Sequence, residues 1–156
     1  MASRKGFSPE ETLRLSVAGF LFLENERENR QDYGTHFFLF GLRNGTGKMA
    51  DRWELPGGKV EEGETLVQAL ERECEEELQL RPTVVKVLDF ADFIHKGNNF
   101  RVYGCLAKIP HEPRVNPEHQ RFGWFTLAQA LHLDLVDSDR DLLKKISQDP
   151  TALGDD

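Results

Sequence analysis

Three glutamates, Glu73, Glu76 and Glu77, are the residues of this sequence whose types and spacing best suit chemistry. Offsets of three and four residues place side chains on one face of a helix, about one turn apart. Like charges at this spacing destabilise a helix by a few tenths of a kcal/mol per pair, roughly, unless something neutralises them. Clustered carboxylate oxygens are the ligands that Mg²⁺ and Mn²⁺ prefer. The pattern therefore predicts a divalent-metal site, and a solvated acidic helix face is the alternative explanation.

The helix that must carry these glutamates is indicated by an apolar stripe within residues 65–78. Glu64 and Thr65 stand at its N-terminal end, where polar side chains cap a helix and a carboxylate complements its dipole. Pro82 follows soon after the stripe and cannot continue a helix. The turn before the helix ends in Gly58, which lacks a Cβ and lets the backbone approach a ligand. The members of the stripe recur at three- and four-residue spacing: Leu66, Ala69, Leu70, Cys74 and Leu78.

Strand patterns surround this helix on both sides. Residues 16–23 form an apolar run typical of a central strand, and residues 36–43 form a second one, so we expect an early hairpin with a long connection. A second hairpin is predicted from residues 83–93 and 100–109, with the turn between them, and a short strand is predicted at residues 122–126. The remaining predictions are turn chemistry at residues 44–48 and short helices near residues 127–133 and 139–147.

The segment from Gly58 to Leu80 resembles the Nudix box. That motif asks for Gly, five residues, Glu, seven residues, Arg-Glu, an aliphatic residue, any residue, Glu-Glu, any residue, Gly and an aliphatic residue. The matching positions, in register, are Gly58, Glu64, Arg72, Glu73, Glu76, Glu77 and Leu80. Gln79 stands where the family has glycine, which normally ends the helix in the left-handed conformation. A glutamine held in that conformation costs about 1 kcal/mol, and it lies downstream of the carboxylates.

The resemblance implies a fold, a cofactor and a reaction. The fold class is α/β, a Nudix-type α/β/α sandwich with a mixed β-sheet. Mg²⁺, with Mn²⁺ as a substitute, would be held by Glu73, Glu76, Glu77 and the backbone carbonyl of Gly58. Arg72 would orient Glu73, and Glu64 would either pair with Arg72 or cap the helix. A metal-activated water would then attack phosphorus, and which carboxylate takes its proton stays open.

Three residues that are not fixed positions of the motif extend the prediction towards the substrate. Residues 49–59 look like the MutT-type branch of the family, the nucleoside triphosphate pyrophosphohydrolases. Lys59 and Arg43 would meet phosphates, the first as a point charge and the second as a fork, unless they are ordinary surface cations. Glu118 stands in the loop where similar members place a late metal ligand or base, and an ordinary loop charge is the alternative.

Two further residues are candidates for contacting the base. Asp139 resembles the position of a base-reading Asn or Asp, although Ser138 or Asp139 would also make a natural helix N-cap. A polar side chain that the wrong base leaves without a hydrogen-bond partner costs roughly 1–3 kcal/mol of binding free energy, and this penalty lets such a site discriminate between bases. Trp124 is aromatic enough to stack on a base, and membership of the core is the alternative for it. The same two readings apply to Phe20, Phe38 and Phe90.

The functions left open are three. The first is hydrolysis of nucleoside triphosphates, with oxidised ones as a candidate class, to the monophosphate and pyrophosphate. The second is hydrolysis of another diphosphate: ADP-ribose, a nucleotide sugar, a dinucleoside polyphosphate or an RNA 5′ end. The third is a non-catalytic nucleotide-binding module on the same fold. The complete carboxylate set favours an enzyme, and the context of residues 49–59 favours the first function over the second.

Length and composition set the outer limits. A chain of 156 residues is expected to form a single domain, with flexible tails at residues 1–11 and 149–156. The net charge of −7 argues against a nucleic-acid partner, which needs a basic face, and a small nucleotide is expected instead. No apolar run approaches the roughly 20 residues of a membrane span. Cytosol is the expected compartment, with an organelle as the alternative, and both monomer and homodimer stay open.

Overall fold

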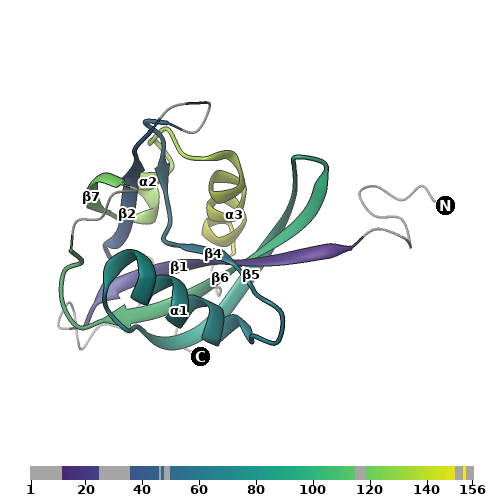
Figure 1. Cartoon of the computed structure of the whole chain (residues 1–156). Helices are drawn as coiled ribbons and strands as arrows, with labels where there is room; N and C mark the ends of the chain where they lie inside the picture. The colour runs from purple at the N-terminus through teal and green to yellow at the C-terminus, as the bar shows by residue number, and fades with distance from the viewer. Residues whose placement is uncertain are drawn as a thin grey trace.

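The strands form two sheets in the computed structural model, which describes residues 12–24, 36–45, 47, 50–114, 119–149 and 153 (Figure 1). The first sheet has four strands in the order β4-β1-β6-β5, and the second has three in the order β3-β2-β7. The first sheet comprises β1 (Leu13–Leu23), β4 (Gly57–Lys59), β5 (Thr83–His95) and β6 (Asn98–Ile109). The second comprises β2 (Phe38–Arg43), β3 (Trp53–Glu54) and β7 (His119–Phe125).

The β1 strand lies at the centre of a mixed sheet, as its apolar run predicts. It pairs in parallel with β6 from Leu13 opposite Asn99 to Leu23 opposite Ile109, and it pairs antiparallel with β4. Its residues from Val17 to Phe22 are buried. A strand buried on both faces reads as a continuous apolar run rather than an alternating one, which is the pattern of this segment.

The expectation that residues 16–23 and 36–43 form a hairpin is wrong. Both edges of β1 are occupied, one by β4 and the other by β6, so β2 has no free edge of β1 to pair with. It pairs instead with β3 and β7 in the second sheet. The hairpin of β5 and β6 is confirmed, with a tighter turn than expected. Lys96 (φ 51°) and Gly97 (φ 79°) form this turn, and two consecutive positive φ angles are typical of two-residue hairpin loops.

Within the described residues, three helices cover the sheets and complete an α/β/α arrangement. Figure 1 shows α1 (Leu66–Leu78) on one side of the long β1 strand and α3 (Asp137–Ser147) on the other. The short α2 (Leu127–Ala130) precedes α3 and is shorter than predicted. The predicted stripe of α1 is buried against the sheet, where Leu70, Cys74 and Leu78 share a core cluster with Leu21 and Cys105. None of the described helices is long and apolar enough to cross a membrane.

Both cysteines are buried core residues. Cys74 of α1 and Cys105 of β6 are fully buried and free. Burial raises the pKa of the Cys105 thiol to about 11 and raises the pKa of Cys74 further still. Thiols held protonated by an apolar environment are poor nucleophiles and poor metal ligands. They act as small hydrophobic side chains at the interface between helix and sheet.

Two expectations concern the tails of the chain and the first residues of α3. Residues 1–11 lie outside the described residues, as does most of the expected C-terminal tail, although Leu153 is buried in the core. The α3 helix begins at Asp137, after Val136, which makes no side-chain capping bond. The N-cap predicted at Ser138 or Asp139 is therefore wrong. Both residues lie inside the first turn of the helix, where they are free for other contacts.

Candidate active site

The α1 helix is fixed at both ends by local contacts. Thr65 is its N-cap: the Thr65 hydroxyl accepts a hydrogen bond from the Gln68 backbone N–H, and the Gln68 side chain accepts one from the Thr65 N–H. This capping box satisfies two donors that a helix start leaves unpaired. At the other end Gln79 adopts the left-handed conformation, with φ 58° and ψ 41°. The departure from glycine at this position therefore leaves the geometry of the helix end intact.

Arg72 is the centre of the acidic cluster. Its Nε donates to Glu64 Oε2 at 2.6 Å, and its Nη2 donates to Glu64 Oε1 at 3.1 Å. Its Nη1 donates to Glu73 Oε2 at 3.0 Å and to Glu76 Oε1 at 3.3 Å. The Nη2 also donates to the Lys59 carbonyl at 2.9 Å. One planar guanidinium thus ties the loop before the helix to two carboxylates on it, as such a fork of donors allows.

Glu64 takes the pairing role rather than the capping role. Its two carboxylate oxygens hold Arg72, and Oε1 also accepts from the Glu61 backbone N–H at 2.8 Å. The hydrogen bond from Arg72 lowers the pKa of the Glu64 carboxyl, and the same contact raises the pKa of Arg72. Both groups are therefore charged at neutral pH, and the pair acts as a rigid brace for the glutamates further along the helix.

Glu73 packs directly over Gly58. A Cβ added at Gly58 would lie 2.5 Å from Glu73 Cδ, so the absence of a side chain at Gly58 is what admits this carboxylate. The two segments meet because Gly58 pairs with Val17 of β1, while α1 packs on the same strand through Leu70 and Leu21. The Glu73 side chain is only 14% exposed. A predicted ligand and the predicted backbone ligand therefore lie side by side, although they are distant in sequence.

The oxygen atoms of this cluster are of the kind that bind a hard divalent cation. Glu73 and Glu76 converge on a single Arg72 nitrogen, so an oxygen of each lies near one point, and Glu77 lies half-buried on the same helix. Carboxylate and carbonyl oxygens are the ligands of Mg²⁺, which keeps several waters. In the part of the chain that the structure describes, no three acidic, histidine or cysteine side chains already converge on one metal position. The side chains would have to turn from Arg72 towards an ion.

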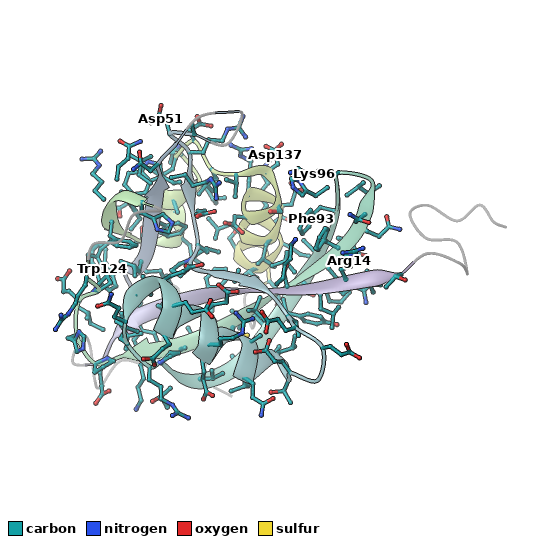
Figure 2. The ribbon with its side chains drawn as sticks, in the orientation of Figure 1. Arg14, Asp51, Phe93, Lys96, Trp124 and Asp137 are labelled. Atoms are coloured by element: carbon teal, nitrogen blue, oxygen red, sulfur yellow. The ribbon has the colours of Figure 1, made fainter. Side chains whose placement is uncertain are left out.

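A cavity of about 320 Å³ lies beside this cluster. Gly58 and Lys59 form the wall that it shares with the acidic helix, and Arg43 and Glu54 line it from the second sheet. Figure 2 shows Phe93 on the β5–β6 hairpin, facing the start of α3. The remaining lining residues are Ser16, Phe93, His95, Phe100, Val136 and Ser138. A concave, partly apolar site with a few converging charges is typical of small-molecule binding.

The structure brings some predicted substrate residues to this cavity and leaves others away from it. Arg43 and Lys59 line it, as the phosphate prediction requires. Asp139 is buried and does not line the cavity, and its Oδ2 accepts a hydrogen bond from the Leu55 backbone N–H at 2.9 Å. The Asp139 pKa is raised to about 7, mainly by burial; the hydrogen bond from Leu55 opposes this shift, and the nearby charge of Glu54 adds to it. Its neighbour Ser138 is the α3 residue that reaches the wall.

The aromatic predictions are placed mostly in the core. Figure 2 shows Trp124 on the opposite side of the view from Phe93, and the Trp124 Nε1 donates to Glu112 at 3.1 Å. Phe20 and Phe38 are fully buried, and their rings meet edge to face 5.8 Å apart. Phe90 is covered on its ring by Arg101 at 4.1 Å and by Lys145 at 4.3 Å. Glu118 lies outside the described residues.

Several residues in and around the cavity escaped prediction, and four of them are considered for the contacts that they make. Phe93 and Phe100 line the cavity and stack with ring centroids 5.1 Å apart, and Glu54 is held by the buried His119. The position of Glu54, close before the glycine turn, was a signal in the sequence that could have marked it. No signal marked the other three, because their positions depend on how the hairpin and β7 pack against the rest of the molecule.

Comparison with known proteins gives a consistent result. A family model described as NUDIX domain matches residues 12–146. The chain is 37% identical over 100 residues to a Mycobacterium tuberculosis protein provisionally named 8-oxo-dGTP diphosphatase 2, with 60% of this chain and 67% of that protein covered. It is 28% identical over 121 residues to the nucleoside triphosphatase NudI of Escherichia coli, with 69% of this chain and 85% of that protein covered.

Solved structures agree with the family match. The solution structure of the E. coli ORF135 protein is 25% identical, with a TM-score of 0.74, and covers 92% of this chain and 94% of its own. The MutT NUDIX hydrolase from Burkholderia pseudomallei is 29% identical, with a TM-score of 0.68, and covers 87% of this chain and 99% of its own. The similarity therefore extends over nearly the whole fold rather than over the acidic helix alone.

Proposed function

The chain belongs to the Nudix family of hydrolases, and from that premise we propose that it hydrolyses nucleoside triphosphates with Mg²⁺. The products are the nucleoside monophosphate and pyrophosphate. The observation that carries the proposal is the position of Gly58 and Lys59, which separate the carboxylate cluster on α1 from a cavity holding Arg43. A triphosphate bound across this wall has its phosphates between the acidic helix and two cations. The names of the relatives, a diphosphatase and a nucleoside triphosphatase, support this substrate class.

The residues of the box divide into proposed metal ligands and residues that hold those ligands in place. Glu73, Glu76, Glu77 and the carbonyl of Gly58 would hold the metal, and Glu118 is the proposed additional ligand or base. When bound there, Mg²⁺ would supply Lewis acidity and a water made more acidic than bulk water. Arg72 neutralises part of the cluster and holds Glu73 and Glu76 in place before an ion arrives. Glu64 keeps Arg72 in position through its two-oxygen contact.

The substrate's phosphates and base face different walls of the cavity. Lys59 and Arg43 contact the phosphates, the first as a point charge and the second through its fork. The base lies towards Asp139 and Ser138 at the start of α3. Asp139 with a raised pKa can act as a donor or an acceptor near neutral pH, which suits a residue that reads ring N–H and carbonyl groups. Trp124 stays a more remote candidate for stacking.

A panel of nucleotides with Mg²⁺ tests the proposal. The panel contains the common ribo- and deoxyribonucleoside triphosphates, 8-oxo-dGTP, ADP-ribose, a nucleotide sugar, a dinucleoside tetraphosphate and a 5′-triphosphorylated RNA. We expect triphosphates to give one pyrophosphate for each monophosphate, measured by ion-exchange chromatography. Cleavage of ADP-ribose or another diphosphate with none of the triphosphates would replace the proposed substrate class by the second one. Binding of nucleotides without any turnover would show a non-catalytic module.

A further inference from the structure

The imidazole of His119 is buried and packed between neighbouring residues of the second sheet. His119 begins β7, and its side chain is 2% exposed. The ring lies on Gly41 of β2: a Cβ added at Gly41 would stand 2.9 Å from both Cγ and Nε2 of the imidazole. On another side the ring of Phe122 packs against it, with centroids 5.2 Å apart. A side chain confined in this way has little freedom to reorient.

The buried histidine is directed at a residue of the cavity wall. Its Nε2 lies 2.8 Å from Glu54 Oε2, and because a carboxylate only accepts, this ring nitrogen carries the hydrogen and donates it. Glu54 is 22% exposed and lines the cavity. His119 is too buried to contact a substrate, but it is hydrogen-bonded to Glu54, which lines the cavity.

Glu54 in turn holds Arg43. The Arg43 Nη1 donates to the two carboxylate oxygens of Glu54, at 3.2 and 3.4 Å. Arg43 lines the same cavity as Lys59, and its buried Nε has no hydrogen-bond partner within the described residues. Glu54 alone would repel a polyphosphate in this cavity. With both of its neighbours donating to it, its charge is compensated and it serves instead to aim a guanidinium.

We infer that His119 is a positioning residue, which acts through Glu54 to hold the Arg43 guanidinium in the orientation that binds substrate phosphate. The inference rests on the proposed function, because it takes a polyphosphate as the occupant of the cavity. His119 does not touch the substrate itself. Its role differs from simple packing in one respect: the donor at Nε2, rather than the volume of the ring, carries the effect.

Steady-state kinetics of His119 variants test this role on the triphosphate that is turned over fastest. We expect His119→Leu to raise KM about tenfold with kcat within about threefold, because a lost charge-assisted hydrogen bond weakens a contact made equally in ground and transition states. His119→Gln keeps an amide N–H near the Nε2 position and should restore KM to within about threefold of the parent value. His132→Leu, at an exposed histidine, is the control and should leave KM unchanged.

A double-variant cycle separates positioning from packing. If His119 acts through Arg43, adding His119→Leu to Arg43→Leu should change KM no further, whereas independent effects would multiply. Thermal unfolding of each variant shows whether it folds. Equal KM values for His119→Leu and the parent, failure of His119→Gln to restore KM, or multiplying effects in the cycle would each overturn the inference.

Binding of inorganic tripolyphosphate without added metal separates this inference from the proposed function. We expect the parent protein to bind it and His119→Leu to bind it about tenfold more weakly by calorimetry. If no nucleoside triphosphate is hydrolysed while this dependence holds, the proposed function fails and the inference stands. If triphosphates are hydrolysed while neither KM nor tripolyphosphate binding depends on His119, the inference fails and the proposed function stands.

Discussion

At the scale of single residues, the site depends on Gly58 having no side chain. The Glu73 carboxylate occupies the space where a Cβ of residue 58 would be, so a glycine is required for the helix and the turn to meet. Arg72 then shares its donors among Glu64, Glu73 and Glu76. The resemblance predicted both features as motif positions, and the structure gives the physical reason for the first.

Gly58→Ala tests this packing. The added methyl group should displace the Glu73 carboxylate, because a flexible side chain yields before backbone does. We expect pyrophosphate release to fall at least about tenfold, since a ligand misplaced by a fraction of an ångström loses most of its contribution. The unfolding temperature should change by only a few degrees, about 2–4 °C for each kcal/mol in a chain of this size. Full activity in Gly58→Ala would show that Glu73 is not held by this contact.

Asp139 predicts a pH dependence of stability. Its pKa is about 7 in the folded protein, against an ordinary value of 3.8 for an aspartate. Between these values the folded carboxyl keeps a proton that the unfolded one has lost. The contribution of Asp139 to stability is therefore fully present below about pH 4 and is lost as the pH rises to about 7, amounting to on the order of 4 kcal/mol.

Asp139→Asn should remove this dependence, because an amide does not titrate and its oxygen still accepts from the Leu55 N–H. The free energy of unfolding, measured in urea between pH 4 and pH 8, should fall with pH more steeply in the parent than in Asp139→Asn. Asp137→Asn alters an exposed carboxylate on the same helix and should reproduce the slope of the parent. Parallel curves for Asp139→Asn and the parent would contradict the raised pKa.

At the scale of elements, α1 is the part of the fold that sequence reasoning located best. The apolar stripe, the polar N-terminal residues and Pro82 are all local signals, and the observed helix, Leu66–Leu78, differs from the expected one by a single residue. The pairing of β1 with β6 had no such signal, because it joins segments far apart in the chain. Assuming that neighbouring strands pair therefore gave a hairpin of β1 and β2 that does not exist.

Gln79→Gly tests the strained end of α1. Gln79 has φ 58°, a conformation that glycine adopts without steric cost, so the glycine of the family motif should stabilise the protein by about 1 kcal/mol. The matched control is Glu75→Gly, at an exposed interior position of the same helix, which should destabilise it by a similar amount. Urea unfolding measures both. Destabilisation by Gln79→Gly would mean that the glutamine side chain makes a compensating contact.

At the scale of the whole molecule, the cavity gathers positive charge in an acidic protein. The chain carries a net charge of −7, yet Arg43 and Lys59 face the same space, from different sheets. The sequence identified both cations but not the other residues that line the cavity. Phe93, Phe100 and the start of α3 come together only because the β5–β6 hairpin packs against the rest of the molecule. The acidic helix on the far side of Gly58 needs a divalent cation to accept a phosphate. A divalent cation at the acidic helix and the two cations of the cavity would therefore bind the same polyphosphate.

Pyrophosphate release by matched glutamine variants of α1 tests this mechanism most directly. Glu77→Gln removes a proposed metal ligand, and Glu75→Gln changes an exposed glutamate of the same helix that is not a proposed ligand. With a nucleoside triphosphate and a few millimolar Mg²⁺, we expect Glu77→Gln to lose at least about 100-fold in kcat and Glu75→Gln to stay within about twofold. Parent-like pyrophosphate release by Glu77→Gln under the same conditions would contradict the assignment of the carboxylates as the metal site.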